Sequence, residues 1–527
     1  MIFTILDCFT DEPAGLGVPP YIGTYPRYIA GAILEAKHSV FYLTIDDLRF
    51  YTARIINFRN GEEKLKDIIE IEKQALRTNI KTKNLSKNIW NIQKILQKTD
   101  FLIIIAGVHT PGKYLSALPG TTKEVAALLR GINYKGYRIL TGPAAQLGSG
   151  LWGGTIARDV SLDLRNFDLI IKDLEYKFEE LVQNKFSADV EKEIKYAMLT
   201  KIAMRGAEIV KQYPDDPRFL IAEIETSKGC PRSPGCSFCT EPVKYCGIAR
   251  RTPEDIIVEI RALNAVGIRN FRLGKQSCFY SYGPASDIEK LLKGARLYAE
   301  ILHIDNVNPL AVTEDKTKLI VQYCTEGNIA AFGVESFDPE VIKANNLKAE
   351  PETIYHAIEI LNKYGAPQGE NGLPRFLPGI NILFGLNRES KKTHEENMFW
   401  LQKILEDGLL FRRINIREVV VFPGTGLYDA CGDKYLKKNR KFYWKWRNEI
   451  RQKIDLPNLK RIVPIGTVLK GVRTEIYDGN TTFCRQIGTY PLIVGIKERL
   501  KLDQFIDIRV KAHMLRSVVA EVSIPKC

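Results

Sequence analysis

The feature that most constrains this chain is a cluster of three cysteines within ten residues, Cys230, Cys236 and Cys239. The largely apolar segment 219–225 precedes the cluster and predicts a buried strand. Glycine and proline residues between the cysteines make the loop turn rather than extend, so that the thiolates can converge on one metal centre. The pattern therefore predicts a metal-binding loop that directly follows a strand.

The number of ligands decides what kind of metal centre this is. Three ligands leave one coordination position open for a substrate or cofactor, which suits an iron–sulfur centre. A structural zinc site takes four protein ligands, and Cys246, seven residues beyond Cys239, is the candidate for the fourth. We favour the three-ligand iron–sulfur centre and keep the four-ligand zinc site as the alternative.

The first third of the chain alternates short apolar runs with helical patterns. Strands are predicted at residues 2–6, 40–43, 101–106, 137–140 and 169–171. One strand and one helix at a time is typical of a parallel sheet, so residues 1–180 are predicted to form a Rossmann-like α/β domain. Within it the charged segment 59–98 is predicted to be an exposed helical insertion, and residues 181–217 a helical connector.

A second alternating series follows, and the tail then changes character. Its strands are predicted at residues 219–225, 271–273, 306–312, 330–335, 379–384 and 416–421. Six such units suit a partial or full (β/α) barrel over residues 218–435, with its chemistry at the carboxyl ends of the strands. Residues 436–462 are interpreted as a basic aromatic linker, and the short strands of residues 463–527 predict a small β-barrel.

Composition narrows the classes of partner and location. The 76 Lys and Arg residues exceed the 62 Asp and Glu residues by 14, which favours a polyanion such as nucleic acid or reflects an ordinary Lys-rich surface. No apolar run is long enough to span a membrane, and the first residues do not read as a secretory signal. Ten cysteines are too few for a disulfide scaffold, so we expect a cytoplasmic protein with free thiols.

A cysteine triplet that ends in Cys-Ser-Phe-Cys after the first strand of a (β/α) barrel resembles the radical S-adenosylmethionine superfamily. Segments 333–340, 381–386 and 422–428 resemble that family's fourth-, fifth- and sixth-strand motifs. The resemblance covers about residues 218–430, and the first gap between cysteines is longer here than is usual in the family. The chain is also similar to archaeal iron–sulfur oxidoreductases with a cobalamin-binding-like N-terminal domain.

The resemblance implies that Cys230, Cys236 and Cys239 hold a [4Fe–4S] cluster whose fourth iron binds S-adenosylmethionine. One-electron reduction would then cleave the sulfonium to a 5′-deoxyadenosyl radical. The residues implied as S-adenosylmethionine contacts are Phe238, Gly274, Gln276, Asn308, Glu335 and Ser336. Against each of these contacts stands an ordinary capping or structural role.

The N-terminal domain resembles the cobalamin-binding domain that often precedes this barrel. The similarity rests on segments 107–111 and 167–175, whereas the Asp-x-His-x-x-Gly motif for the lower ligand is absent. Two alternatives remain: cobalamin binds without a histidine ligand, or the domain keeps only its fold. The residues expected to line a cobalamin or substrate crevice are Asp11, Gly23, His109 and Glu175.

The C-terminal segment resembles the small RNA-binding barrels of the TRAM type. The residues expected to contact nucleic acid are Lys470, Arg473, Arg485, Lys511 and Arg516. A solvated charged face on a domain that caps the substrate site is the alternative.

Taken together, the sequence predicts a radical enzyme that modifies RNA, with tRNA the first candidate, by methylation of an unactivated carbon. Such an enzyme needs an electron donor for its cluster. One alternative is radical chemistry on a small molecule or a protein side chain. The other is a non-enzymatic RNA-binding protein with a structural metal site.

Overall fold

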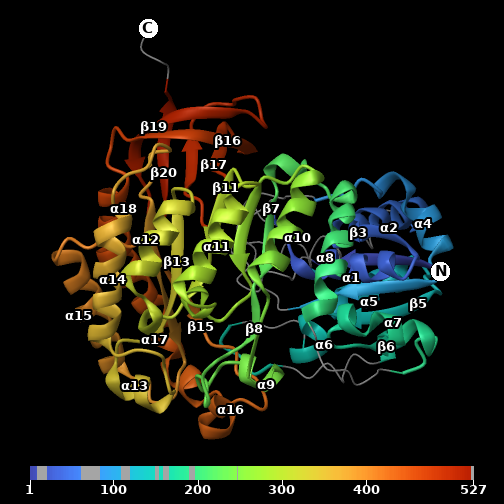
Figure 1. Ribbon diagram of the computed structural model, residues 1–527, viewed down its shortest axis with the longest axis horizontal. Helices are drawn as coiled ribbons and strands as arrows, with labels where there is room; N and C mark the ends of the chain where they lie inside the picture. Colours follow the sequence, from blue (N-terminus) through green and yellow to red (C-terminus); the bar gives the residue numbers. More distant parts are fainter. Residues whose placement is uncertain are drawn as a thin grey trace. The chain divides into compact units, whose positions relative to one another are not determined.

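The computed structural model describes residues 1–8, 21–60, 84–107, 119–148, 153–157, 165–188, 196–245 and 247–523 (Figure 1). The chain separates into two compact units. The first contains Met1–Trp152, Ala157–Glu223 and Asp255–Arg269, and the second contains Gly153–Ile156, Ile224–Glu254 and Asn270–Cys527. No helix in the described ranges is long and apolar enough to cross a lipid bilayer.

The first unit is built on a five-stranded parallel sheet with the order β3-β1-β4-β5-β6. Its strands are β1 (Ile2–Asp7), β3 (Ser39–Thr44), β4 (Phe101–Ile105), β5 (Tyr137–Thr141) and β6 (Leu169–Ile170). Residues 3–7 of β1 and 102–105 of β4 are fully or almost fully buried, as expected for a parallel sheet that helices cover on both faces. The predicted Rossmann-like sheet is confirmed strand by strand.

Helices cover this sheet and join into one core. They are α1 (Thr24–Glu35), α2 (Ile45–Asn60), α4 (Ile92–Lys98), α5 (Thr122–Gly131), α6 (Pro143–Leu147), α7 (Leu174–Gln183) and α8 (Tyr196–Gly206). Helices α1 and α8 approach so closely that a Cβ at Gly31 would lie 1.9 Å from the carbonyl oxygen of Ile202. The segment predicted as a connector therefore packs within the first unit.

The prediction of an exposed insertion at residues 59–98 was wrong for its last part. Ile92, Ile95 and Leu96 of α4 are buried and belong to the same core as β1 and β4. The spacing of these residues predicts a helix, but the many charged residues around them make its apolar face, which packs on the sheet, difficult to recognise. Residues 61–83 of this segment lie outside the described ranges.

The second unit carries two parallel half-sheets. In the first, β10 (Asn270–Gly274) lies between β11 (Ile301–Ile304) and β7 (Ile221–Glu225), and the second has the order β12-β13-β14-β15. Its strands are β12 (Asn306–Val307), β13 (Asn328–Glu335), β14 (Phe376–Phe384) and β15 (Arg413–Glu418). The predicted (β/α) barrel is thus a partial one.

The third predicted strand, 306–312, was placed too late in the chain. The strand pairing occupies residues 301–304 and 306–307, and Asn308 stands before the 3₁₀ turn η6 (Pro309–Ala311). Pro309 has no N–H group to donate to a neighbouring strand, which ends the pairing there.

Helices alternate with these strands. They are α9 (Glu241–Lys244), α10 (Pro253–Ala265), α11 (Ala285–Arg296), α12 (Glu314–Tyr323), α13 (Pro339–Ala344), α14 (Pro351–Gly365), α15 (Lys391–Glu406) and α16 (Gly426–Cys431). The predicted linker 436–462 is instead α17 (Lys434–Ile450), the π-turn η7 (Arg451–Asp455) and α18 (Leu456–Ile462). Trp446 of α17 is buried and stacks on Phe384 and His394, with ring centroids 5.8 and 5.1 Å apart. Part of the aromatic run at 442–447 therefore packs against the half-barrel.

The C-terminal strands form a closed barrel with the order β16-β17-β18-β20-β19, as predicted. They are β16 (Val468–Asp478), β17 (Thr481–Gln486), β18 (Ile493–Ile496), β19 (Phe505–His513) and β20 (Ser517–Val522). Strand β17 is largely polar, and no apolar run in its sequence predicts it. The barrel core includes Leu377 of β14 and Leu459 of α18, so this barrel belongs to the same compact unit as the half-barrel.

Candidate metal centre

A short hairpin sets the base of the cysteine loop. Strands β8 (Ser227–Gly229) and β9 (Ile248–Arg250) pair in antiparallel fashion on either side of the loop. Gly229 has a φ of +81°, and a Cβ there would lie 2.0 Å from the carbonyl oxygen of Gly247. The Cys230 N–H donates to that same oxygen at 3.1 Å. Glycine is therefore required at 229 for the hairpin to close immediately before the first thiol.

Hydrogen bonds to the end of α13 hold the loop in place. The Arg232 guanidinium donates to the carbonyl oxygens of Asn346 and Leu347 at 3.1 and 3.3 Å. In return the Asn346 side-chain amide donates to the carbonyl oxygens of Pro234 and Gly235, each at 2.8 Å. The first gap of the cysteine triplet is thus clamped from both sides.

The second gap is fixed at Ser237. Its N–H donates to the Asn345 carbonyl oxygen at 2.9 Å, and its own carbonyl accepts from Leu427 N–H at 2.8 Å. Cys236 belongs to an apolar core with Val419, Val421 and other residues that follow the half-barrel strands, and Phe238 packs against that core. Phe238, predicted near S-adenosylmethionine, thus lies with the cysteines on this core.

Burial and nearby cations oppose each other at the thiols. Burial raises the pKa of Cys236, and Lys348 and Arg232 act against it. Burial also raises the pKa of Cys239 to about 11. Arg232 Nη1 lies 3.4 Å from Cys236 Sγ, so a cation directly faces this sulfur. Metal binding must therefore displace protons, and the thiolates that result have positive charge beside them.

The donor set fits an iron–sulfur cluster. Three thiols from one loop are soft ligands, and the cations Arg232 and Lys348 would offset the negative charge of a thiolate-bound cluster. Across the described ranges, no three His, Cys, Asp or Glu side chains lie close enough together to hold an ion as they stand. Cys246, the candidate fourth ligand of a zinc site, lies outside those ranges.

Glu335 lies beside the thiols at the end of β13. A bulge between Phe332 and Glu335 interrupts the pairing with β14, and Glu335 has a φ of 66°. A Cβ at Gly333 would lie 3.3 Å from Glu335 Oε1 and 3.4 Å from Lys348 Nζ. Burial raises the pKa of Glu335 to about 7 against the pull of Lys348 and Arg417. Glu335 therefore combines backbone strain, partial burial and an unusual pKa, which are properties typical of a functional carboxyl.

Of the other predicted S-adenosylmethionine contacts, one has a hydrogen-bond acceptor without a partner among the described residues, and two have structural roles. Gln276 is buried, its Nε2 donates to the Leu273 carbonyl at 3.0 Å, and its Oε1 accepts no hydrogen bond from any described residue. Asn308 Oδ1 caps η6 by accepting from Leu310 N–H at 3.2 Å. Ser336 Oγ accepts from Asp338 N–H at 3.1 Å. Gln276, just after Gly274 at the end of β10, therefore offers a free acceptor, whereas Asn308 and Ser336 have capping and turn roles.

Two acids that no sequence motif predicts lie at or shortly after the carboxyl ends of β14 and β15. Glu389 is buried and accepts from Gly385 N–H at 2.6 Å and from the Asn439 amide at 2.9 Å. Burial above all, and also the neighbouring Glu418, raise the pKa of Glu389 to about 7. A Cβ at Gly154 would lie 3.2 Å from the Glu418 carboxylate. Neither acid stands in a recognisable motif, so only the fold reveals them.

The N-terminal sheet reverses its strand order between β1 and β4, which is where such sheets bind ligands. Asp7 at the end of β1 is buried and accepts from Tyr42 Oη at 2.8 Å. Glu175 is buried in the first turn of α7, and Gly23 precedes α1. Asp11 and His109, the other two predicted crevice residues, lie outside the described ranges.

The predicted nucleic-acid contacts occupy two different environments. Lys470 and Lys511 are exposed on the C-terminal barrel. Arg473 and Arg485 are buried, and pair with Asp503 at 2.6 Å and with Glu475 at 2.7 Å. The expectation that these two arginines face RNA is corrected, because burial and internal ion pairs occupy them. Arg516 lies among other arginines at the base of the barrel.

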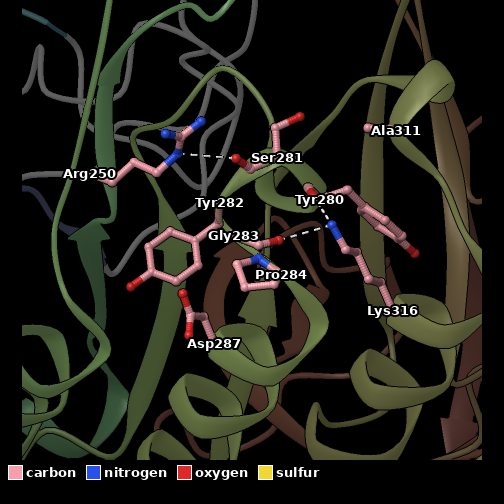
Figure 2. A pocket seen from close by; sticks show the side chains of 9 residues that line it. All are labelled: Arg250, Tyr280, Ser281, Tyr282, Gly283, Pro284, Asp287, Ala311 and Lys316. Carbon is pink, nitrogen blue, oxygen red and sulfur yellow. Dashed lines mark hydrogen bonds between the residues drawn. The ribbon is translucent and has the colours of Figure 1, made fainter.

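A surface hollow of about 590 Å³ lies beside the hairpin (Figure 2). Arg250 of β9 closes one side and donates to the Ser281 carbonyl oxygen at 3.2 Å. Lys316 closes the other and donates to the carbonyl oxygens of Tyr280 and Gly283 at 2.8 and 3.0 Å. Both cations are thus used to hold the loop that forms the wall.

Known proteins match this chain in two ways. Residues 224–398 match the Radical SAM superfamily. An uncharacterised protein of Methanocaldococcus jannaschii is 42% identical over 98% of this chain and 92% of its own length. One from Archaeoglobus fulgidus is 37% identical over 98% of this chain and 89% of its own length.

Solved structures resemble the chain loosely. The radical S-adenosylmethionine methyltransferase TsrM from Kitasatospora setae, with cobalamin and a [4Fe–4S] cluster bound, covers 81% of this chain and 76% of its own, with 12% identity and a TM-score of 0.45. The cobalamin-dependent radical enzyme OxsB covers 84% of this chain and 56% of its own, with 13% identity and a TM-score of 0.48.

Proposed function

Because this chain belongs to the radical S-adenosylmethionine superfamily, we propose that it is an enzyme that methylates an unactivated carbon of RNA, with tRNA the first candidate. The superfamily's [4Fe–4S] cluster and S-adenosylmethionine supply, when bound, the one-electron chemistry. The observation that supports RNA is the closed C-terminal barrel, which lies in the same compact unit as the cysteine loop and exposes lysines. Small closed barrels of this size commonly bind oligonucleotides.

The chain's own residues have three tasks at the cysteine loop. Cys230, Cys236 and Cys239 would hold the cluster, while Arg232 and Lys348 offset its negative charge. Glu335 and the free Oε1 of Gln276 offer acceptors for the positively charged groups of S-adenosylmethionine. The apolar core around Cys236 keeps water away from one side of the loop.

The N-terminal sheet is proposed to hold cobalamin, which would carry the methyl group. The support is its strand order, which reverses between β1 and β4, the place where sheets of this kind bind ligands. An electron-donor protein is the further partner that this chemistry requires. Thiolate ligands need a reducing compartment, so we propose the cytoplasm as the location.

The proposal for RNA makes a direct prediction about Lys470 and Lys511. Replacing both by Gln is expected to weaken RNA binding several-fold and to lower the slope of log K against log salt by roughly one to two, since each lysine releases about one counterion from RNA. Binding is measured by fluorescence anisotropy at several salt concentrations. Lys501→Gln, an exposed lysine between β18 and β19, is the control. An unchanged salt slope would remove these lysines from the RNA surface.

The substrate itself is tested by mass spectrometry of RNA from cells that lack the gene. We expect one RNA nucleoside to carry hydrogen in place of a methyl group and so to be lighter by one CH2. The modification is expected to return with the wild-type gene and with Cys324→Ala, whose cysteine directly follows α12. Cys236→Ala is expected not to restore it. If the RNA is the same with and without the gene, although the purified enzyme cleaves S-adenosylmethionine, the substrate is a small molecule or a protein instead.

A further inference from the structure

The amino end of β15 gathers four arginines and one carboxylate. Arg412 precedes the strand, Arg413 begins it, Arg451 begins η7, and Arg516 lies between β19 and β20. The carboxylate is Asp455, the last residue of η7, which pairs with Arg451 and accepts from the Ile414 N–H at 3.1 Å. The half-barrel strand β15, the turn η7 and the β19–β20 turn of the C-terminal barrel thus bring positive charge together in one place.

Hydrogen bonds hold two of these arginines in position. Arg451 is 4% exposed and donates through Nη1 to the Ile414 carbonyl oxygen at 2.6 Å. Arg412 donates through Nη2 to the carbonyl oxygen of Tyr490 at 3.1 Å. The guanidinium of Arg413 lies 5.2 Å from the centre of the Tyr490 ring. Arg412 and Arg413 are therefore ordered by the backbone and an aromatic ring, and Arg451 by the backbone and Asp455.

Much of the donor capacity is unused. The Nε–H groups of Arg412, Arg413 and Arg451 are buried and have no hydrogen-bond partner among the described residues. No ion pair joins a described carboxylate to Arg413 or Arg516, although Asp455 lies close enough to Arg516 to oppose the fall in its pKa. Burial and the neighbouring arginines lower the pKa of Arg413 to about 9, and lower that of Arg516 as well. Buried donors and unpaired charges of this kind destabilise a fold unless a ligand satisfies them.

We propose that this arginine cluster, made of Arg412, Arg413, Arg451 and Arg516, binds a phosphate group. Asp455 acts on Arg412, Arg451 and Arg516, and no described carboxylate acts on Arg413, so four guanidinium groups share one carboxylate and an excess of three positive charges remains. A phosphate brings up to two negative charges and several acceptor oxygens, and the planar guanidinium fork bonds two of them at once. A single carboxylate ligand would leave most of the cluster unpaired.

The site is distinct from the cysteine loop. The six-residue strand β15 separates Arg413 from Val419, which packs with Cys236, so the two sites are about 20 Å apart along the strand. The cluster therefore anchors a phosphate at a distance from the chemistry. The phosphate has two possible sources: the backbone of a nucleic acid, or a small phosphorylated molecule. The proposal stands whether or not RNA is the substrate.

The test measures phosphate binding to the full-length protein by calorimetry and thermal unfolding, at constant ionic strength in chloride. Inorganic phosphate is expected to raise the Tm of the wild type. Arg516→Gln is expected to weaken phosphate binding at least tenfold and to unfold, without phosphate, at the same temperature as the wild type or a higher one, because it removes repulsion. Lys453→Gln, which removes one charge paired with Glu449 on the neighbouring turn, is expected to bind phosphate normally.

Two results would overturn the proposal. One is an equal phosphate-induced shift in the wild type and Arg516→Gln. The other is a large loss of stability of Arg516→Gln in phosphate-free buffer, which would make this arginine structural. The source is then decided by competition. Displacement of phosphate by RNA with hydroxyl ends assigns the site to a backbone phosphate, and displacement by a nucleoside monophosphate alone assigns it to a small molecule.

Discussion

The two ends of β15 differ in the sign of the charged side chains that are buried there. At the carboxyl end, Glu418 lies near buried Glu389, and burial raises the pKa of both acids. At the amino end, Arg413 lies among other arginines, and burial lowers its pKa. Each end holds charge that the described residues do not fully neutralise. The difference indicates that burial favours the neutral form of the acids at one end of the strand, whereas the arginines at the other end keep an excess of positive charge that suits an anion.

The largest expected effect concerns the cation at the thiols. Arg232→Gln removes both the charge beside Cys236 and the clamp to Asn346, so we expect about tenfold slower cleavage of S-adenosylmethionine and a more negative cluster potential. Arg232→Lys is expected to restore the cluster potential more fully than the cleavage rate. Lysine returns the positive charge, but it lacks the guanidinium group that donates to the carbonyl oxygens of Asn346 and Leu347. Anaerobic redox titration measures the potential. Slower cleavage at an unchanged cluster potential would show that Arg232 acts only by holding the cysteine loop in place.

The next test addresses the acids at the carboxyl end. The folded-state pKa of Glu389 is raised from 4.5 to about 7, so the folded protein loses stability as pH rises through this window. The shift corresponds to about 3 kcal/mol as an upper bound. We expect Glu389→Gln, which keeps the acceptor for Asn439, to flatten the fall in unfolding free energy between pH 5 and 8. Glu395→Gln, an exposed acid on the helix α15 that follows Glu389, is the control. An equal slope in wild type and Glu389→Gln would show that Glu389 is ionised normally.

A smaller effect tests how the C-terminal barrel joins the amino end. Tyr490 is buried and donates to Asp305 at 2.6 Å, and the backbone of the same loop accepts from Arg412. Tyr490→Phe is expected to lower the free energy of unfolding by about 2 kcal/mol, because the bond is buried and involves a carboxylate. Tyr355→Phe removes a similar bond to Asp407 at the surface and is expected to cost much less. Equal losses in urea unfolding would show that the Tyr490 contact is as exposed as the Tyr355 one.

The sequence predicts local features well and distant contacts poorly. The cysteine loop and the five strands of the first sheet are encoded in adjacent residues, so their patterns are legible. The third half-barrel strand was placed too late because the apolar residues 310–312 follow the turn at Pro309 and look like a continuation of the strand. Helix α17 looked like a linker because its charges hide the packing face of Trp446. The arginine cluster and the Glu389–Glu418 pair come from segments far apart in the chain. Only the fold brings them together.

The central claim is that the three cysteines start radical chemistry, and anaerobic reconstitution of the full chain tests it most directly. The claim predicts roughly four irons per chain, as a [4Fe–4S] cluster requires, and reductant-dependent cleavage of S-adenosylmethionine that Cys236→Ala abolishes and Cys324→Ala leaves unchanged. One zinc per chain with no cleavage, or full cleavage by Cys236→Ala, would contradict it.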